Sequence, residues 1–159
     1  MLQISEEVIN TSIEFINSAS EDVLNDYSER YADTQESLVG YVFQTAAEDD
    51  DDELLSYFVY YYTLIMHIFE NSGKKLPVID DAFIDAFHED YLELIDEYTE
   101  SEDFSELVDF IGQPVLIDFL LHDISTADDE GNMIDEEMQN ILSMVLIGLV
   151  GILTKVEGQ

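Results

Sequence analysis

The chain has 159 residues and a formal net charge of −34 at pH 7, because 38 Asp and Glu stand against 4 Lys and Arg. This imbalance excludes binding to nucleic acid by phosphate neutralisation and adsorption to an anionic membrane, since both need clustered cations. The chain contains no Cys, which excludes disulfides, thiolate nucleophiles and Cys-ligated zinc. Its 47% hydrophobic residues, with 9 Phe and 9 Tyr, indicate a chain that folds around a core.

The length and the apolar pattern predict one helical domain. No linker divides the chain, so we expect a single acidic helical domain over residues 1–159. Gly and Pro are few and apolar residues recur at spacings of three and four, which predicts an all-α fold, a helical bundle of six or seven helices. The N-terminal residues MLQISEEVIN lack the basic and apolar regions of a signal peptide, so we expect a cytoplasmic location.

Polar residues mark the first predicted helices. The first is expected to run from its N-cap, Ser5, to Ser18, and the second is expected to start at Ser20. A break near residues 33–34 precedes a third helical stretch that ends at about Ala47. The inward-facing candidates of this third stretch are Leu38, Val39, Val42 and Phe43.

A run of consecutive carboxylates, Glu48–Glu53, follows this stretch and precedes an aromatic segment. Residues 51–53 are predicted to form the first turn of the fourth helix, where unpaired N–H groups and the helix dipole favour anions. The helix is expected to continue to about Asn71 and to end at Gly73.

The next predicted helix, over about residues 80–98, has the clearest amphipathic pattern, with apolar and acidic residues on opposite faces. Ser101 is then expected to cap a short helix over residues 103–111, and a Gly and a Pro separate this from a helix over 114–124.

The last helix is expected from about Met133 to Thr154, and it is apolar on all sides between Ile141 and Leu153. This apolar stretch is shorter than the roughly 20 residues of a membrane-spanning helix. We therefore expect an apolar central C-terminal helix. The alternative is that this helix forms a subunit interface, which would make the protein a homo-oligomer.

The sequence gives little support for catalysis. His67, His88 and His122 fall on three different predicted helices, and none belongs to an HExxH or ExxH pair. The sequence also lacks a nucleophile elbow and a phosphate-binding Gly-rich loop. We therefore expect no enzymatic activity, no catalytic residue and no cofactor.

A calcium loop is a weak alternative interpretation of ADDEGNMIDEEM, residues 127–138. With Gly131 at loop position 6, Asp128, Glu130 and Glu137 occupy ligand positions 3, 5 and 12, but the ligand at position 1 is lost. If the loop starts one residue later, so that Ile134 is at position 8, Ala127 occupies position 1 and Met138 replaces the bidentate acid. An acidic turn followed by a helix with acids in its first turn explains the same residues.

The charge is the strongest functional signal. Like charges four residues apart disfavour a helix by roughly 0.2–0.5 kcal/mol per pair, so a row of them from Asp85 to Glu97 indicates a role other than stability. We expect a non-enzymatic protein that binds a basic partner, as a DNA mimic or as an inhibitor or immunity-type protein that occupies a nucleic-acid-binding surface. The alternative is an acidic helical domain without a dedicated basic partner, or the weak calcium binder.

The predicted contacts lie in two acidic segments. The partner-binding candidates are Glu48, Asp49, Asp50, Asp51, Asp52, Glu53, Asp85, Glu89, Glu93 and Glu97.

Overall fold

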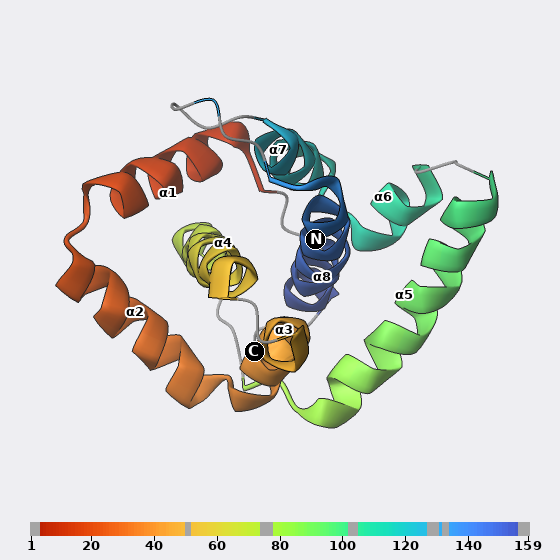
Figure 1. The fold of residues 1–159 in the computed structure, drawn as a ribbon, viewed down its shortest axis with the longest axis horizontal. Helices are drawn as coiled ribbons and strands as arrows, with labels where there is room; N and C mark the ends of the chain where they lie inside the picture. The colour runs from red at the N-terminus through yellow and green to blue at the C-terminus, as the bar shows by residue number, and fades with distance from the viewer. Residues whose placement is uncertain are drawn as a thin grey trace.

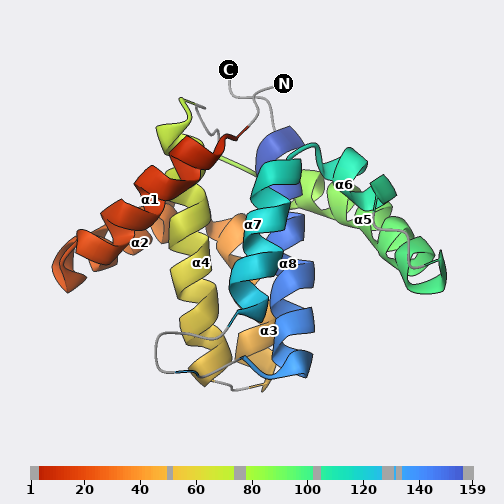
Figure 2. The same ribbon diagram turned by 90° about the horizontal axis from the view of Figure 1, so that it is seen from above.

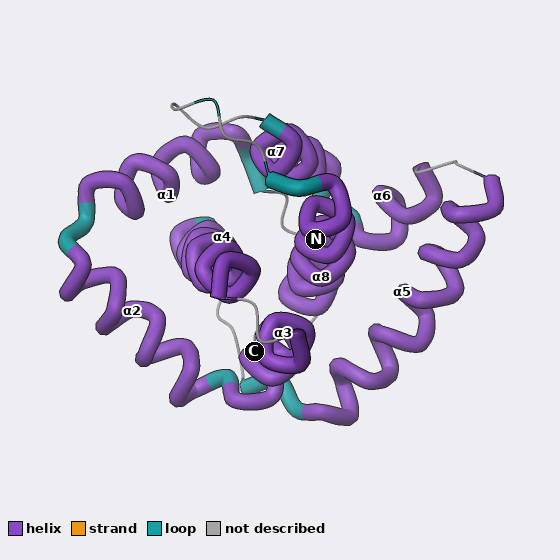
Figure 3. The backbone as a smooth tube through the Cα atoms, in the orientation of Figure 1, coloured by secondary structure: helices purple, strands orange, loops and turns teal. Residues whose placement is uncertain are grey.

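The computed structural model describes residues 4–49, 52–73, 78–101, 105–126, 131 and 134–155. All regular secondary structure in these ranges is helical, as expected, and it forms eight helices rather than six or seven (Figure 3). They are α1 (Glu6–Ser18), α2 (Glu21–Thr34), α3 (Glu36–Asp49), α4 (Asp52–Asn71), α5 (Asp81–Ser101), α6 (Ser105–Ile111), α7 (Pro114–Ser125) and α8 (Glu136–Lys155).

Four helices, α3, α4, α7 and α8, run alongside one another at the centre of the molecule. Figure 1 shows them end-on, and Figure 2 shows them from the side. On one side, α1 and α2 pack against α4; on the other side, α5 and α6 pack against α8, and α5 also contacts α3. The helices α2 and α5 therefore lie at opposite edges of the fold, each with one face exposed.

Serine caps begin the first two helices where the sequence predicts them. The backbone N–H of Val8 donates to Ser5 Oγ, and that of Val23 donates to Ser20 Oγ, both at 3.3 Å. Each bond satisfies one of the N–H groups that a helix start leaves without a partner in the helix. The predicted end of α4 is also confirmed, since the helix ends at Asn71. Gly73, two residues later, adopts φ 91°, a value that glycine tolerates readily.

Two predicted boundaries are wrong. Ser101, the predicted N-cap of the next helix, is instead the last residue of α5, and α6 begins at Ser105. No Gly or Pro occurs between residues 81 and 111, so no strong local signal ends α5 earlier. In addition, α8 begins at Glu136 rather than near Met133, because the two residues before Glu136 are not helical.

The C-terminal helix α8 is central among the described helices. It contacts α3, α4, α5, α6 and α7, and its residues from Val145 to Thr154 are all buried. By length and composition, α8 is the one described helix that could cross a membrane. Most of its apolar window is nevertheless buried inside the fold, as in the core helix of a globular domain.

Two glycines of α8 allow α3 and α5 to approach it closely. A Cβ atom at Gly148 would collide with the hydroxyl of Tyr41 from α3, and one at Gly151 would lie 2.5 Å from the ring of Phe87 in α5. The distance between α3 and α5 is set partly by these two contacts with the same helix.

Two buried glutamines form hydrogen bonds between segments that precede different helices. Gln35 Oε1 accepts a hydrogen bond from the N–H of Ile79 at 3.0 Å, and Gln113 Oε1 accepts one from the N–H of Ile4 at 2.9 Å. Both glutamine side chains are buried. Because Gln35 lies directly before α3 and Ile79 lies just before α5, the first of these bonds holds the starts of α3 and α5 together.

Candidate functional site

The exposed side of α5 carries a dense row of carboxylates. At about 100° per residue, they all fall within one half of the helix circumference, and Ile84, Phe87 and Tyr91 are buried on the other half. From Asp81 to Glu97 the helix rises about 24 Å, so the carboxylates average about one per 4 Å. The exposed carboxylates are Asp81, Asp85, Glu89, Asp90, Glu93, Asp96 and Glu97, which include the four predicted on this helix.

Aromatic contacts hold the apolar half of α5 against the core. The hydroxyl of Tyr91 donates to the carbonyl of Met144 in α8 at 2.5 Å, and burial raises the pKa of Tyr91, so that it remains a donor. The ring of Phe87 stacks on Tyr91 and on Phe110 of α6, with centroid distances of 5.5 Å and 5.6 Å. Because these contacts fix the apolar half inward, the acidic half faces outward.

The second predicted acidic segment lies where α3 ends and α4 begins. Glu48 is exposed and accepts a hydrogen bond from Gln44 Nε2 at 3.1 Å. Asp52 and Glu53 are exposed in the first turn of α4, as the sequence predicts. Outside the described part of the structure lie the side chain of Asp49 and the residues Asp50 and Asp51.

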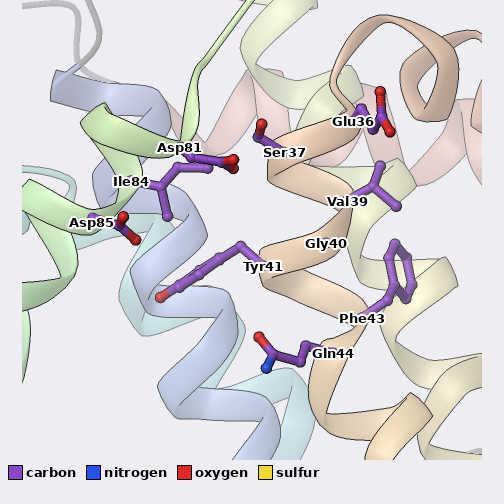
Figure 4. A pocket seen from close by; sticks show the side chains of 10 residues that line it. All are labelled: Glu36, Ser37, Val39, Gly40, Tyr41, Phe43, Gln44, Asp81, Ile84 and Asp85. Carbon is purple, nitrogen blue, oxygen red and sulfur yellow. The ribbon is translucent and has the colours of Figure 1, made fainter.

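A groove of about 850 Å³ lies between α3 and α5. Figure 4 shows the carboxylates of Asp81 and Asp85 pointing from α5 toward α3, while Tyr41 points from α3 toward α5 and α8. Glu36, at the start of α3, adds a third carboxylate to the lining. Gly40 also lines the groove, and no heavy atom lies within 4 Å of the position that its Cβ would take.

The groove joins part of the predicted acidic surface to residues that the sequence analysis missed. Of the partner-binding candidates, Asp85 lines it, whereas Glu89, Glu93 and Glu97 continue along α5. The signal that could have found them is the helical spacing of polar and small residues at positions 36, 37, 40 and 44, which is typical of an exposed helix face. They did not indicate which helix would lie opposite that face.

Comparisons with known protein families, with curated proteins and with solved structures gave no match. The functional argument therefore rests on the geometry and charge of this chain.

Both basic residues in the described ranges join helices to one another. Arg30 of α2 forms a salt bridge with Glu70 of α4 at 3.0 Å and lies 4.8 Å from the ring centroid of Tyr27. Lys155, at the end of α8, lies 4.1 Å from the ring centroid of Phe110. These cations therefore contribute to packing between helices.

The histidines occupy three separate environments. His67 Nδ1 lies 2.8 Å from Ser12 Oγ, and its ring stacks on Phe15 at 4.3 Å between centroids; burial lowers its pKa. His88 contacts the Tyr41 ring edge-on, with 5.5 Å between centroids. His122 is exposed at the end of α7.

The predicted calcium loop is described only in part. Asp128 and Glu130 lie outside the described ranges, and Glu137 is exposed in the first turn of α8. Within those ranges, no three His, Asp or Glu side chains gather in a way that could hold a metal ion. Calcium binding by this loop stays a prediction.

Proposed function

We propose that this chain is a non-enzymatic acidic protein that binds a basic partner through α5 and the acidic residues around the junction of α3 and α4. The target surface is one that binds DNA or RNA, so the protein acts as a DNA mimic or as an inhibitor or immunity-type protein. The observation that carries this proposal is the row of exposed carboxylates on one half of α5.

The charge density of this row is close to that of a nucleic acid. One carboxylate per about 4 Å along α5 compares with one phosphate per about 3.4 Å along each strand of DNA. A basic groove whose cations are arranged for phosphates would therefore meet a similar density of charge on α5. Such a field also steers association, raising its rate by roughly 10–10³ at low salt.

The energetic cost of the charge supports a functional role. The formal charge of −34 destabilises the compact state through self-repulsion, and exchanging a few of the exposed acids for Lys would relieve it. A dedicated basic partner explains why the row is nevertheless uniform in sign.

The decisive experiment reverses charge on α5. The variant Glu89→Lys, Glu93→Lys, Glu97→Lys changes the formal charge from −34 to −28, since each substitution adds two units. A matched control, Glu7→Lys, Glu14→Lys, Glu21→Lys, makes the same change on exposed positions of α1 and α2, across the molecule from α5. Each tagged protein is incubated with a nuclease-treated bacterial lysate and washed at about 0.5 M salt, where the screening length is only a few ångströms.

We expect the wild-type protein and the control to retain one dominant basic nucleic-acid-binding protein that added DNA displaces, and the α5 variant to lose it. A diffuse set of basic proteins that all wash away, or equal losses in both variants, would show that the charge attracts cations without selectivity. The acidic domain without a dedicated partner would then replace this proposal.

A further inference from the structure

The groove between α3 and α5 is an open hollow in the acidic surface, large enough to receive a side chain. Its volume of about 850 Å³ lies within the roughly 300–1,000 Å³ of sites that bind small groups. Its lining combines the carboxylates of Glu36, Asp81 and Asp85 with the ring of Tyr41. The two aspartates of α5 and the tyrosine ring lie on the same side of α3, and this combination is complementary to a cationic side chain.

We propose that this groove receives one arginine side chain of the basic partner, with the guanidinium near Asp81 and Asp85 and against Tyr41. This inference rests on the proposed function, because it assigns the partner a specific contact at the N-terminal end of the acidic row of α5. Charge complementarity selects the occupant, since the three carboxylates lie within a chain of formal charge −34.

The chemistry of the lining favours arginine over lysine. Asp81 and Asp85 are four residues apart, so they project from the same face of α5. A guanidinium has five donors in one plane, which can bond carboxylates in a bidentate manner and stack on an aromatic ring. The ammonium group of lysine is a compact point charge. It can match the charge contact of arginine, but not its bidentate hydrogen bonds or its stacking on the ring.

The groove is formed before any partner arrives. The bond between the N–H of Ile79 and Gln35 Oε1 fixes the starts of both helices. Tyr41 is held by its edge contact with His88 and by the close approach of its hydroxyl to Gly148. A site held in this way loses little conformational entropy when it binds, so less of the contact energy is spent on ordering.

Gly40 offers a test that leaves the charge unchanged. Glycine within a helix costs about 1 kcal/mol of stability relative to Ala. At position 40 no neighbouring atom occupies the space that a side chain would fill. A large side chain at this position would extend into the groove, whereas Ala would leave most of it open. Gly40→Leu and Gly40→Ala therefore form a matched pair that separates groove filling from helix stabilisation.

The probes are two fluorescently labelled peptides of equal length and charge, one composed of lysine and one in which a central lysine is replaced by arginine. Fluorescence anisotropy at about 0.15 M salt gives both affinities for each variant. We expect the wild-type protein and Gly40→Ala to prefer the arginine peptide by about tenfold, which corresponds to about 1.4 kcal/mol. Gly40→Leu should lose this preference while keeping its affinity for the lysine peptide.

Circular dichroism shows whether Gly40→Leu folds. A second pair of variants tests the groove even if it does not. Asp81→Asn with Asp85→Asn should lose the arginine preference, whereas Glu7→Gln with Glu14→Gln, the same charge change on α1, should keep it. The groove proposal is overturned if the wild-type protein shows no arginine preference, or if that preference survives in the groove variants. The charge-reversal variant on α5 tests the proposed function separately, because its positions lie outside the groove lining.

Discussion

The side-chain oxygen of Gln113 accepts a hydrogen bond from the backbone N–H of Ile4 at 2.9 Å and so joins two segments that are 109 residues apart. Both residues are buried, so water cannot replace this bond if it is lost. The bond attaches the segment before α1 to the turn between α6 and α7.

Replacing Gln113 by Leu should therefore destabilise the fold. The substitution keeps the volume but leaves the buried N–H of Ile4 without its acceptor, which costs about 1–3 kcal/mol. Urea denaturation gives the change in the free energy of unfolding. Gln44→Leu is the matched control, because Gln44 is exposed and a surface substitution changes stability by only about 0.5 kcal/mol. Equal losses in the two variants would contradict a special role for Gln113.

Two buried tyrosines predict opposite effects of removing a hydroxyl. The hydroxyl of Tyr62 has no hydrogen-bond partner among the described residues, whereas that of Tyr91 donates to Met144. Tyr62→Phe should leave the free energy of unfolding unchanged or raise it by about 1 kcal/mol, because a buried unpaired polar group is costly. Tyr91→Phe should lower it by about 0.5–1.5 kcal/mol. Thermal denaturation of both variants checks the difference, and a loss at Tyr62 equal to that at Tyr91 would reveal a partner for its hydroxyl.

The glycines predict a contrast of sign. In Gly151→Ala the new Cβ would lie 2.5 Å from the ring of Phe87 and 2.6 Å from Ile111 Cδ1, so these two buried side chains would have to shift. Overpacking of this kind costs about 1–3 kcal/mol. Gly40→Ala meets nothing within 4 Å and should stabilise by about 0.5–1 kcal/mol. Chemical denaturation measures both, and stabilisation by Gly151→Ala would mean that the helices around α8 pack less tightly than described.

Repulsion among the carboxylates of α5 should lower the free energy of unfolding. Glu89→Lys replaces two like-charge pairs, with Asp85 and Glu93, by two opposite-charge pairs and should raise the free energy of unfolding by about 1 kcal/mol at low salt. At about 1 M salt this gain should shrink to a few tenths of a kcal/mol, because screening shortens to about 3 Å. Denaturation at both salt concentrations checks this, with Glu89→Gln expected to gain about half as much. A gain independent of salt would point to a cause other than repulsion.

The local features of the fold were predictable because they depend on residues that are close in the sequence. Ser5 and Ser20 cap helices, Gly73 follows the end of α4, and the alternation of apolar and acidic residues along α5 matches its buried and exposed sides. The error at Ser101 has the same origin, since a serine before acidic residues has the composition of a helix start even where the preceding helix continues.

The candidate site was only half predictable. The acidic face of α5 follows from periodicity, but the groove depends on which helices pack together. The bond between Gln35 and Ile79 spans 44 residues, and neither residue marks itself as a partner of the other in the sequence. Gly148 and Gly151 are two small residues in an apolar run, and their effect on the spacing of α3 and α5 needs three helices in place.

Arg30 and Lys155, the basic residues that the structure describes, join helices, and the whole sequence has only 4 Lys and Arg against 38 Asp and Glu. The compensation of the acidic face of α5 therefore depends largely on dissolved cations. Those ions are held loosely and are mobile. A partner whose own lysines and arginines occupy the same positions would return them to bulk solution, and their regained translational freedom would favour the complex. Association would then draw on the entropy of small ions as well as on contacts between the two proteins.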